Sequence, residues 1–475
     1  MDILNNQIDE LKNNLINDII DIVKIPSVEG EPTNGYPFGE NVDKALKKAL
    51  EISKKLGFKT KNLDGYMGYA ELGEGEEYIG ILGHLDVVPE GTGWSYDPYG
   101  GTIDNGKIYG RGVLDNKGPI ISALYGLKAV QNSGLKLNKK VRIIFGTNEE
   151  TGFNDIPYYL SKEKPPIMGF TPDCKYPVVY GERGIGKLSI SKEIDLKGLK
   201  IYGDFKSNVV PDKCKIDIPV EYIHEDIICY LEEKAINLNI KINDNLNIKI
   251  NDNLNIKMDE KFISIEVKGK QAPANAPQLG ENAITYMIEY LINENLIKDE
   301  ELNSFLKFIN EYFHNEYYGE KINIDFEDEL TGKLYLNPYE LKYENNRINL
   351  MFSVRYPMTC TMDYILSKIK VNLEDKLSLK VESNFNPVNF DKNSYLVRSL
   401  QNAYERVTGL DGTPTTTSGG TYAKVMPNIV PFGPSFPGQK GIAHNSDEYM
   451  DIDDIILNAK IFANAIYELA KEEKC

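Results

Sequence analysis

Two short apolar segments decide the fold: YIGILGHLDVVP at residues 78–89 and VRIIFGTNEE at residues 141–150. The apolar run in each is too short for a helix and closes on a glycine, which is typical of a buried strand. Residues 118–130, GPIISALYGLKAV, lie between them and indicate a helix. The order strand, helix, strand predicts an α/β sheet, with polar motifs at the strand edge where open α/β sheets bind ligands.

Helices are predicted on both sides of this unit along the chain. Apolar residues recur at steps of three and four from residue 3 to residue 22, and a second helix is expected at 40–56. Near the other end of the chain, residues 395–407 and 452–471 indicate two more helices. We therefore predict a central, mostly parallel sheet flanked by helices.

The middle of the chain has a different texture. Residues 186–384 alternate strand-like segments such as KLSISKEI with helical ones such as ENAITYMIEYLI, which is an α+β pattern. We predict an inserted α+β domain there, with the first domain formed by residues 1–185 and 385–475. An octapeptide repeat at 238–261, LNIKINDN twice and then LNIKMDEK, predicts short strands joined by Asn/Asp turns.

Composition excludes several classes of protein. The 475 residues carry 54 Lys and Arg against 71 Asp and Glu, a net charge of −17 that disfavours binding to nucleic acid. No apolar run approaches the 18 or so residues of a membrane span. The acidic N-terminal segment lacks secretory features, and the five cysteines share no C-x-x-C spacing, so we expect a cytoplasmic protein without a disulfide framework.

Four histidines are present, and two of them lie in motifs rich in acids and glycine. His84 follows the first strand, with Asp86 two residues later. Such a pair suits a metal ligand and its carboxylate partner, although a lone His-Asp pair is more often a surface hydrogen bond. His444 lies in GIAHNSDEYM. His224 and His314 are predicted to be surface residues.

Acidic residues follow the strands. Glu149 and Glu150 leave the second strand together, where they repel each other unless a cation or solvent compensates; an exposed acidic turn is the alternative. Asp115 and Asp173 lie in loops marked by glycine or proline. Together with two imidazoles, these carboxylates predict a site for two divalent ions about 3.5 to 4 Å apart, and the N/O donor set favours Zn²⁺, Co²⁺ or Mn²⁺.

The motifs GHLDVVP, GRGVLDNKGP, GTNEE, GFTPD and GIAHNSDEYM, in this order, resemble the di-zinc metallopeptidases that include aminoacylase, carboxypeptidase G and the carnosinases. The nearest resemblance is to bacterial dipeptidases of the peptidase V type. Segments such as SNVVPD, VRYP and SGGTYAKVMPN extend it over nearly the whole chain. It implies a catalytic domain with an inserted lid domain, acting on dipeptides or short peptides with a free C-terminal carboxylate.

The resemblance also implies roles for individual residues. Asp115 would bridge the two ions, with His84 and Asp173 on one and Glu150 and His444 on the other. Glu149 would be the general base that takes a proton from the attacking water, and Asp86 the partner of His84. The residues implied to hold the substrate are Asn208, Arg355, Ser418 and Gly419. For Arg355 a bidentate grip on the carboxylate or a salt bridge remains open.

One position departs from the family pattern. Where relatives carry an oxyanion-binding histidine in the lid, this chain has Pro273, and Gln271 or Asn275 could supply the donor instead. Two alternatives therefore stay open: a deacylase of N-acyl amino acids, and a catalytically weak relative that binds metal and peptide. The sequence leaves monomer and homodimer equally open.

Overall fold

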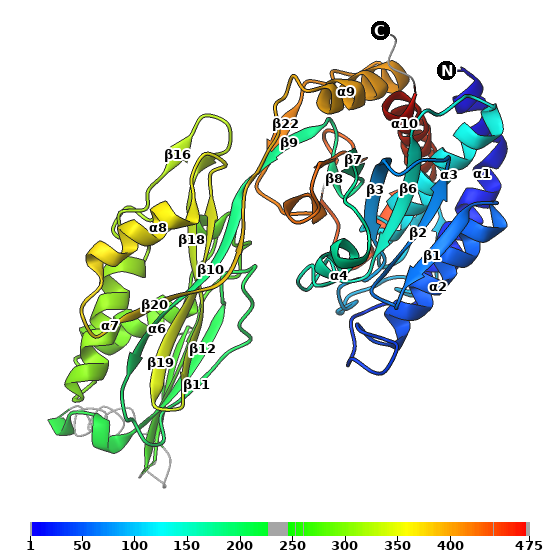
Figure 1. The fold of residues 1–475 in the computed structure, drawn as a ribbon. Coiled ribbons are helices and arrows are strands. Elements are labelled where there is room, and N and C mark those ends of the chain that lie inside the picture. Colours follow the sequence, from blue (N-terminus) through cyan, green and yellow to red (C-terminus); the bar gives the residue numbers. More distant parts are fainter. Residues whose placement is uncertain (1, 227–245, 252, 260, 440, 472–475) are drawn as a thin grey trace. The chain divides into compact units, whose positions relative to one another are not determined.

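The computed structural model describes residues 2–226, 246–251, 253–259, 261–439 and 441–471. The chain forms two compact units, residues 1–182 with 388–475 and residues 183–387. Figure 1 shows that the first unit is built from both ends of the chain, coloured blue and orange to red. The second unit is continuous in sequence, and the two junctions lie three residues from those expected at 185 and 384.

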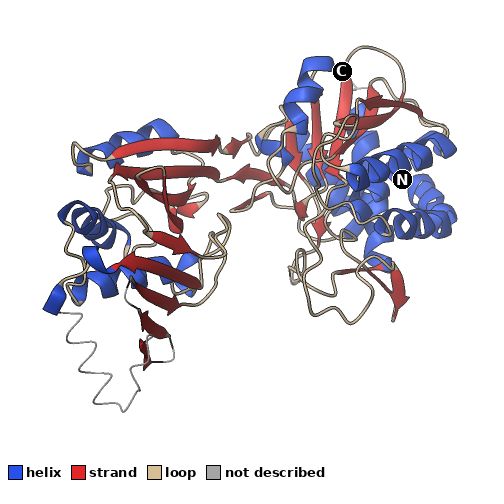
Figure 2. Ribbon diagram, turned by 90° about the horizontal axis from the view of Figure 1, so that it is seen from below, coloured by secondary structure: helices blue, strands red, loops and turns tan. Residues whose placement is uncertain are grey.

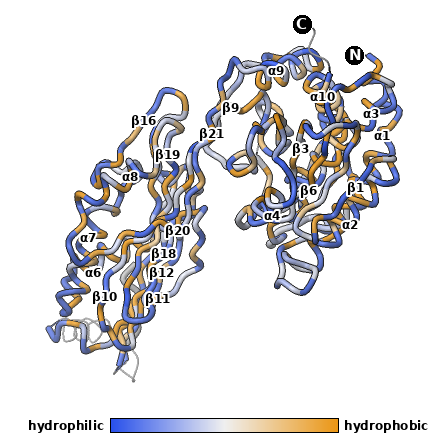
Figure 3. The backbone as a smooth tube through the Cα atoms, viewed as in Figure 1, coloured by the Kyte–Doolittle hydropathy of each residue, from blue (hydrophilic) through white to orange (hydrophobic). Residues whose placement is uncertain are grey.

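A six-stranded sheet forms the centre of the first unit, in the order β1-β2-β6-β3-β7-β23. Strands β6, β3, β7 and β23 run parallel, and β2 pairs antiparallel with β6 and β1. The strands are β1 Lys59–Leu63, β2 Met67–Leu72, β3 Tyr78–His84, β6 Lys140–Gly146, β7 Met168–Thr171 and β23 Ile429–Pro431. All seven residues of β3 are buried, as its apolar sequence predicts, and Figure 3 shows the hydrophobic run along β6.

Helices pack on this sheet and on one another. Helix α3 contacts β3 and β6 and also lies against α1 and α10, and α2 packs on β1 and β2. The helices are α1 Asp2–Val23, α2 Glu40–Lys55, α3 Lys117–Ser133, α4 Asp155–Lys162, α9 Tyr395–Thr408 and α10 Ile452–Ala470. A Cβ at Gly126 would lie 2.9 Å from the Ala463 nitrogen, so glycine permits the close approach of α3 and α10. The predicted helices and strands of this unit are confirmed, and so is the α/β fold class.

The described loops of the first unit contain short strands that pair in three small sheets. They are β4 Thr102–Asp104, β5 Lys107–Tyr109, β8 Cys174–Lys175, β9 Val179–Glu182, β21 Val388–Asn389, β22 Thr415–Thr417, β24 Pro434–Ser435 and β25 Tyr449–Asp451. Of these, β25 pairs antiparallel with β5, so the segment after His444 is joined to the segment before Asp115.

Among its described residues, the second unit has two large antiparallel sheets, the short pair β16-β17 and three α-helices, and Figure 2 shows its strands in red and its helices in blue. One sheet has the order β18-β19-β10-β20 and the other β11-β12-β15-β14-β13. The first comprises β18 Tyr335–Glu344, β19 Arg347–Tyr356, β10 Gly184–Glu193 and β20 Ser378–Phe385. The second comprises β11 Lys200–Tyr202, β12 Lys213–Pro219, β15 Phe262–Lys268, β14 Leu254–Met258 and β13 Leu246–Asn251. The helices are α6 Ala283–Asn293, α7 Glu300–Phe313 and α8 Met362–Ile369, and the minor strands are β16 Glu327–Asp328 and β17 Gly332–Lys333.

The structure bears on two predictions for this unit, the octapeptide repeat and the exposure of His314. The second and third copies of the octapeptide repeat form the antiparallel pair β13 and β14, whereas residues 238–245 lie outside the described residues. The prediction that His314 is a surface residue is wrong. Its ring packs edge-on against Tyr286 at 5.2 Å and its Nε2 lies 3.4 Å from Glu289, because residue 314 directly follows the buried end of α7.

Candidate metal centre

The predicted metal ligands and Glu149 meet at the carboxyl ends of three parallel strands. His84 is the last residue of β3 and lies opposite Gly146, the last residue of β6, three residues before Glu149. Thr171 ends β7, two residues before Asp173. Because neighbouring parallel strands end at one edge of the sheet, local chain direction brings these side chains together.

Asp115 lies between the two histidines. Its Oδ1 is 2.9 Å from Nε2 of His84, and its Oδ2 is 3.2 Å from Nε2 of His444. The His444 Nε2 is also 3.1 Å from Oε1 of Glu150. Asp115 therefore presents one carboxylate oxygen to each imidazole, which is the geometry required of a bridging ligand.

Two groups of donors could each hold a metal ion. One combines His84 with Glu149 and Asp173, and the other combines His84 with Asp115 and Glu150; within each group the ligand atoms lie within 4.8 Å of one another. These donors are imidazole nitrogens and carboxylate oxygens without sulfur, a set that suits Zn²⁺, Co²⁺ or Mn²⁺. The residues present therefore fit divalent ions.

The carboxylates of this site carry strongly shifted pKa values. Burial and the charge of Asp115 raise the pKa of Asp173 to about 7. Burial and the charge of Asp173 likewise raise the pKa of Glu149 well above its ordinary value. Crowded carboxylates that leave water favour a nearby positive charge, which is the condition a bound cation satisfies.

The same charges act in the opposite direction on the imidazoles. Burial alone lowers the pKa of His444, but hydrogen bonds to Asp115 and Glu150 outweigh it and raise the pKa to about 10. For Asp115, burial raises the pKa, whereas hydrogen bonds from His444 and His84 hold it well below its ordinary value. Asp115 therefore stays ionised at the centre of the cluster.

Asp86 contacts His84 through a different atom from the one expected. The Nδ1 of His84 lies 2.9 Å from the main-chain oxygen of Asp86 and 3.6 Å from its carboxylate Oδ1. The carboxylate Oδ2 accepts a hydrogen bond from the main-chain N–H of Glu150 at 3.0 Å. Asp86 thus orients the His84 ring by its carbonyl and holds the Glu150 backbone by its side chain.

Asp155 supports the Glu149 loop and was not singled out from the sequence. Its Oδ2 accepts hydrogen bonds from the N–H of Thr147 at 2.8 Å, the N–H of Asn148 at 3.2 Å and the hydroxyl of Tyr422 at 2.5 Å. Asp155 and Tyr422 are completely buried. The available sequence signal is the segment SGGTYAKVMPN, which contains Tyr422 but in which only Ser418 and Gly419 are given a role.

No role is predicted from the sequence for Arg111 or Glu448, although they lie in the motifs GRGVLDNKGP and GIAHNSDEYM. They form an ion pair of 2.6 Å with almost no exposure to solvent. Lys117, two residues after Asp115, is fully buried and donates to the main-chain oxygen of Ile25 at 2.7 Å. Burial lowers the pKa of Lys117 to about 7.

The proposed substrate-binding residues are divided between the units. Arg355 lies on β19 and Asn208 in the loop before β12, both in the second unit. Ser418 and Gly419 follow β22 in the first unit, where the Gly419 N–H donates to Oγ1 of Thr417 at 3.3 Å.

Pro273, where the resemblance predicts a histidine, is an exposed residue in a loop of the second unit, between the buried Ala272 and Ala274. It forms an isolated bridge with Val209, and the next residue, Ala274, donates its N–H to the oxygen of Asn208 at 2.9 Å. The loop that carries Pro273 is therefore bound to the segment that carries Asn208. Gln271 is exposed and Asn275 is half-buried.

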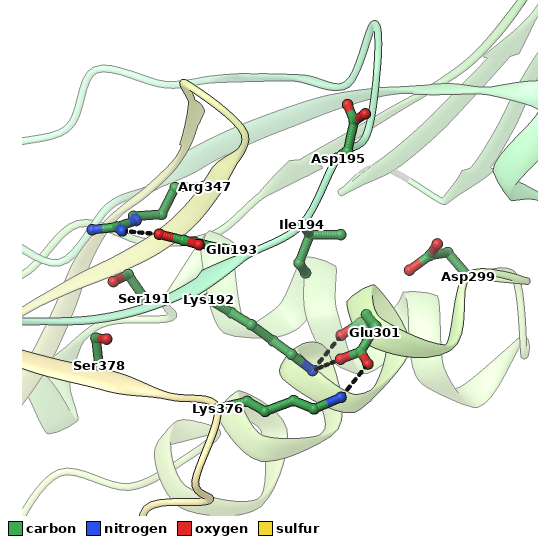
Figure 4. A pocket seen from close by; sticks show the side chains of 10 residues that line it. All are labelled: Ser191, Lys192, Glu193, Ile194, Asp195, Asp299, Glu301, Arg347, Lys376 and Ser378. Atoms are coloured by element: carbon green, nitrogen blue, oxygen red, sulfur yellow. Dashed lines mark hydrogen bonds and ion pairs between the residues drawn. The ribbon is translucent and has the colours of Figure 1, made fainter.

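A cavity of about 650 Å³ in the second unit contains none of the candidate ligands. Figure 4 shows its side chains, which are Ser191, Lys192, Glu193, Ile194, Asp195, Asp299, Glu301, Arg347, Lys376 and Ser378. Glu301 lies between Lys192 at 2.5 Å and Lys376 at 2.6 Å, and Arg347 pairs with Glu193. The basic groups of this cavity are therefore paired with glutamates.

Comparison with known proteins gives a consistent result. The model of the peptidase family M20/M25/M40 matches residues 80–468. YtjP of Bacillus subtilis is 36% identical over 470 residues, which cover 97% of this chain and 98% of that protein. The Beta-Ala-Xaa dipeptidase of Lactobacillus delbrueckii subsp. lactis is 34% identical over 481 residues, which cover 98% of this chain and 97% of that protein.

Solved structures show the same fold. Human carnosine dipeptidase 1 has a TM-score of 0.58 at 17% identity, with 98% of both chains covered. Among the described residues, no helix is long and apolar enough to cross a membrane. The family match spans every candidate ligand from His84 to His444, and the chain therefore belongs to the peptidase family M20/M25/M40 and is a metallopeptidase.

Proposed function

We propose that this metallopeptidase hydrolyses dipeptides or short peptides with a free C-terminal carboxylate, with two divalent ions, zinc foremost and Mn²⁺ or Co²⁺ as alternatives. The observation that carries the proposal is the placement of Asp115, with one oxygen toward His84 and the other toward His444. The names of relatives support a dipeptide substrate, since one that is 34% identical is a Beta-Ala-Xaa dipeptidase.

In this proposal Asp115 would bridge the two ions, His84 and Asp173 would hold one, and Glu150 and His444 would hold the other. Bound ions of this kind polarise a peptide carbonyl and lower the pKa of water toward neutrality. The distances of Asp115 and Glu150 from His444, 3.2 and 3.1 Å, support a shared site for these three side chains.

Glu149 is the proposed general base. It takes the proton of the attacking water and returns it to the leaving amine, so its carboxylate must gain and lose a proton near neutral pH. Burial and neighbouring carboxylates raise its pKa, which supports this role. Asp155 and Asp86 keep the loop in place through the N–H groups of Thr147, Asn148 and Glu150.

Asn208, Arg355, Ser418 and Gly419 are proposed to hold the substrate. The planar guanidinium of Arg355 suits a bidentate contact with the C-terminal carboxylate of a peptide. Ser418 and Gly419 lie in a glycine-rich turn that can offer main-chain donors to the peptide backbone.

The decisive experiment compares Glu149→Gln with the parent protein. The variant is expected to lose turnover by at least about 10²-fold, because general-base catalysis contributes roughly that much, while retaining about two metal ions per chain. His84→Ala serves as the matched variant that lowers the metal content. Loss of metal from Glu149→Gln would make Glu149 a ligand and contradict its assignment as the base.

A substrate panel tests the main alternative, a deacylase. Dipeptides are offered beside N-acetyl and N-succinyl amino acids at the same metal loading. Hydrolysis of the acylated compounds alone would contradict the dipeptidase proposal and establish the deacylase.

The weak-relative alternative is motivated by Pro273. Loss of one oxyanion donor costs about 10² to 10³ in rate. A large gain in kcat for Pro273→His would favour that alternative, whereas an unchanged kcat shows that other donors suffice.

A further inference from the structure

Glu448 connects two loops that carry candidate ligands. It follows His444 by four residues, and its side chain is fully buried. Its Oε1 accepts hydrogen bonds from the N–H of Leu114 at 2.9 Å and from the N–H of Asp115 at 3.2 Å. A single oxygen of Glu448, four residues after His444 in the sequence, thus binds the main-chain N–H groups of Leu114 and Asp115.

The second oxygen of Glu448 is also occupied. Its Oε2 accepts a 2.6 Å hydrogen bond from Arg111, whose side chain is 1% exposed. Arg111 donates in addition to the main-chain oxygen of Glu90 at 3.2 Å and lies 5.3 Å from the ring centroid of Trp94. A buried carboxylate with both oxygens occupied and its charge matched has one stable orientation.

The main chain at Glu448 also connects the segment after His444 with the segment before Asp115. The oxygen of Glu448 accepts a hydrogen bond from the N–H of Gly110 at 2.9 Å, and Tyr449 pairs with Tyr109 in the β25–β5 ladder. The segments 109–115 and 444–449 are therefore joined by the Glu448 side chain, by its main-chain oxygen and by the β25–β5 pairing, at five residues in all: Tyr109, Gly110, Arg111, Leu114 and Asp115. A rotation of the Leu114–Asp115 peptide would move both oxygens of Asp115 away from His84 and His444.

We propose that Glu448 is a positioning residue that sets the orientation of Asp115, and thereby the affinity of the site for divalent ions. Glu448 acts through Asp115, since the bonds above reach the Asp115 main chain. The inference rests on the proposed function, because it assigns Asp115 to the metal site.

The opposing explanation is that Glu448 only stabilises the fold. Both explanations predict a lower free energy of unfolding when the side chain is removed, because Arg111 is left with an unpaired buried charge. They differ in metal binding by the folded protein. Groups that hydrogen-bond to metal ligands typically contribute about 10- to 100-fold to metal affinity. An ion pair that touches no ligand is not expected to change that affinity.

The test is titration of the full-length, chelator-treated protein with Zn²⁺ and Co²⁺, read by calorimetry and by the visible absorption of Co²⁺. Glu448→Ala removes the acceptor, and Glu448→Gln keeps one oxygen for the two N–H groups. Glu163→Gln is the control, since Glu163 forms a similar ion pair with Arg142 at 2.9 Å but contacts no candidate ligand by a described bond. Circular dichroism establishes that each variant is folded.

We expect about 10- to 100-fold weaker binding by Glu448→Ala, a smaller loss in Glu448→Gln and parental affinity in Glu163→Gln. Parental affinity and Co²⁺ absorption in folded Glu448→Ala would overturn the inference. Should that variant not fold, Glu448→Gln decides: an altered Co²⁺ spectrum supports the inference, and an unaltered spectrum with parental affinity overturns it. A parent protein that binds no ion would instead contradict the proposed function.

Discussion

Asp155→Asn is expected to change how the stability of the first unit depends on pH. The Asp155 carboxylate accepts three hydrogen bonds at Oδ2, yet it is completely buried. Burial outweighs the bond from Tyr422 and raises the pKa of Asp155 from 3.8 to about 6. At a pH between these two pKa values, Asp155 is protonated in the folded chain and ionised in the unfolded chain.

The sign and the magnitude of the effect follow from that difference. Because the folded-state pKa is higher, the contribution of Asp155 to the free energy of unfolding falls as pH rises from about 4 to about 6 and then stays level. From 3.8 to about 6 is about 2.2 pH units, which corresponds to about 3 kcal/mol at about 1.36 kcal/mol per unit. Asparagine does not titrate, so the stability difference between parent and variant should change by about this amount across the window.

The assay is urea unfolding from pH 3.5 to 7.5 with chelator present, followed by tryptophan fluorescence. The chain has one tryptophan, Trp94, and it lies in the first unit, so the signal reports that unit. Asp9→Asn, which removes an exposed carboxylate of α1 that pairs with Lys460, is the control for the loss of one charge. Profiles for Asp155→Asn and the parent that stay parallel from pH 4 to 6 would refute the reasoning.

Three further variants test the packing and the proposed substrate contact. Gly146→Ala would place a Cβ 2.1 Å from the Tyr422 hydroxyl oxygen, so we expect a loss of about 1 to 3 kcal/mol in unfolding free energy, measured by urea titration; an unchanged midpoint would contradict the packing. Leu188→Ala truncates a fully buried side chain of the second unit and should cost about 2 to 5 kcal/mol, measured by circular dichroism. Arg355→Lys should raise KM for dipeptides about tenfold or more while leaving KM for C-terminal amides unchanged; equal effects on both substrates would remove Arg355 from carboxylate binding.

Much of the site follows from local sequence because its residues come just after strands. His84 ends β3, Glu149 and Glu150 follow β6, and Asp173 follows β7. Apolar runs of this length predict buried strands, and a helix between two of them predicts that they are parallel. Parallel neighbours end at the same sheet edge, so the convergence of these side chains could be predicted without knowledge of tertiary contacts.

Contacts between distant segments could not be predicted in this way. Along the sequence, Glu448 lies more than 330 residues from the two N–H groups that donate hydrogen bonds to it, and Tyr422 lies 267 residues from Asp155. The acids and the tyrosine of such contacts look like ordinary loop residues in the sequence. The Asp86 result has a related cause, because an H-x-D motif does not specify whether the carbonyl or the carboxylate faces the imidazole.

Apolar periodicity and motif order are local properties of the chain, so they were enough to predict the succession of strands and helices, the insertion in the middle of the chain and the family. Tertiary structure alone decided which oxygen of Asp115 meets which histidine, that His314 is buried, and that Asp155 and Glu448 hold the loops of the candidate site. The physical reason is that hydrogen bonds and burial depend on distances between segments remote in sequence, and those distances are set by the packing of the whole unit.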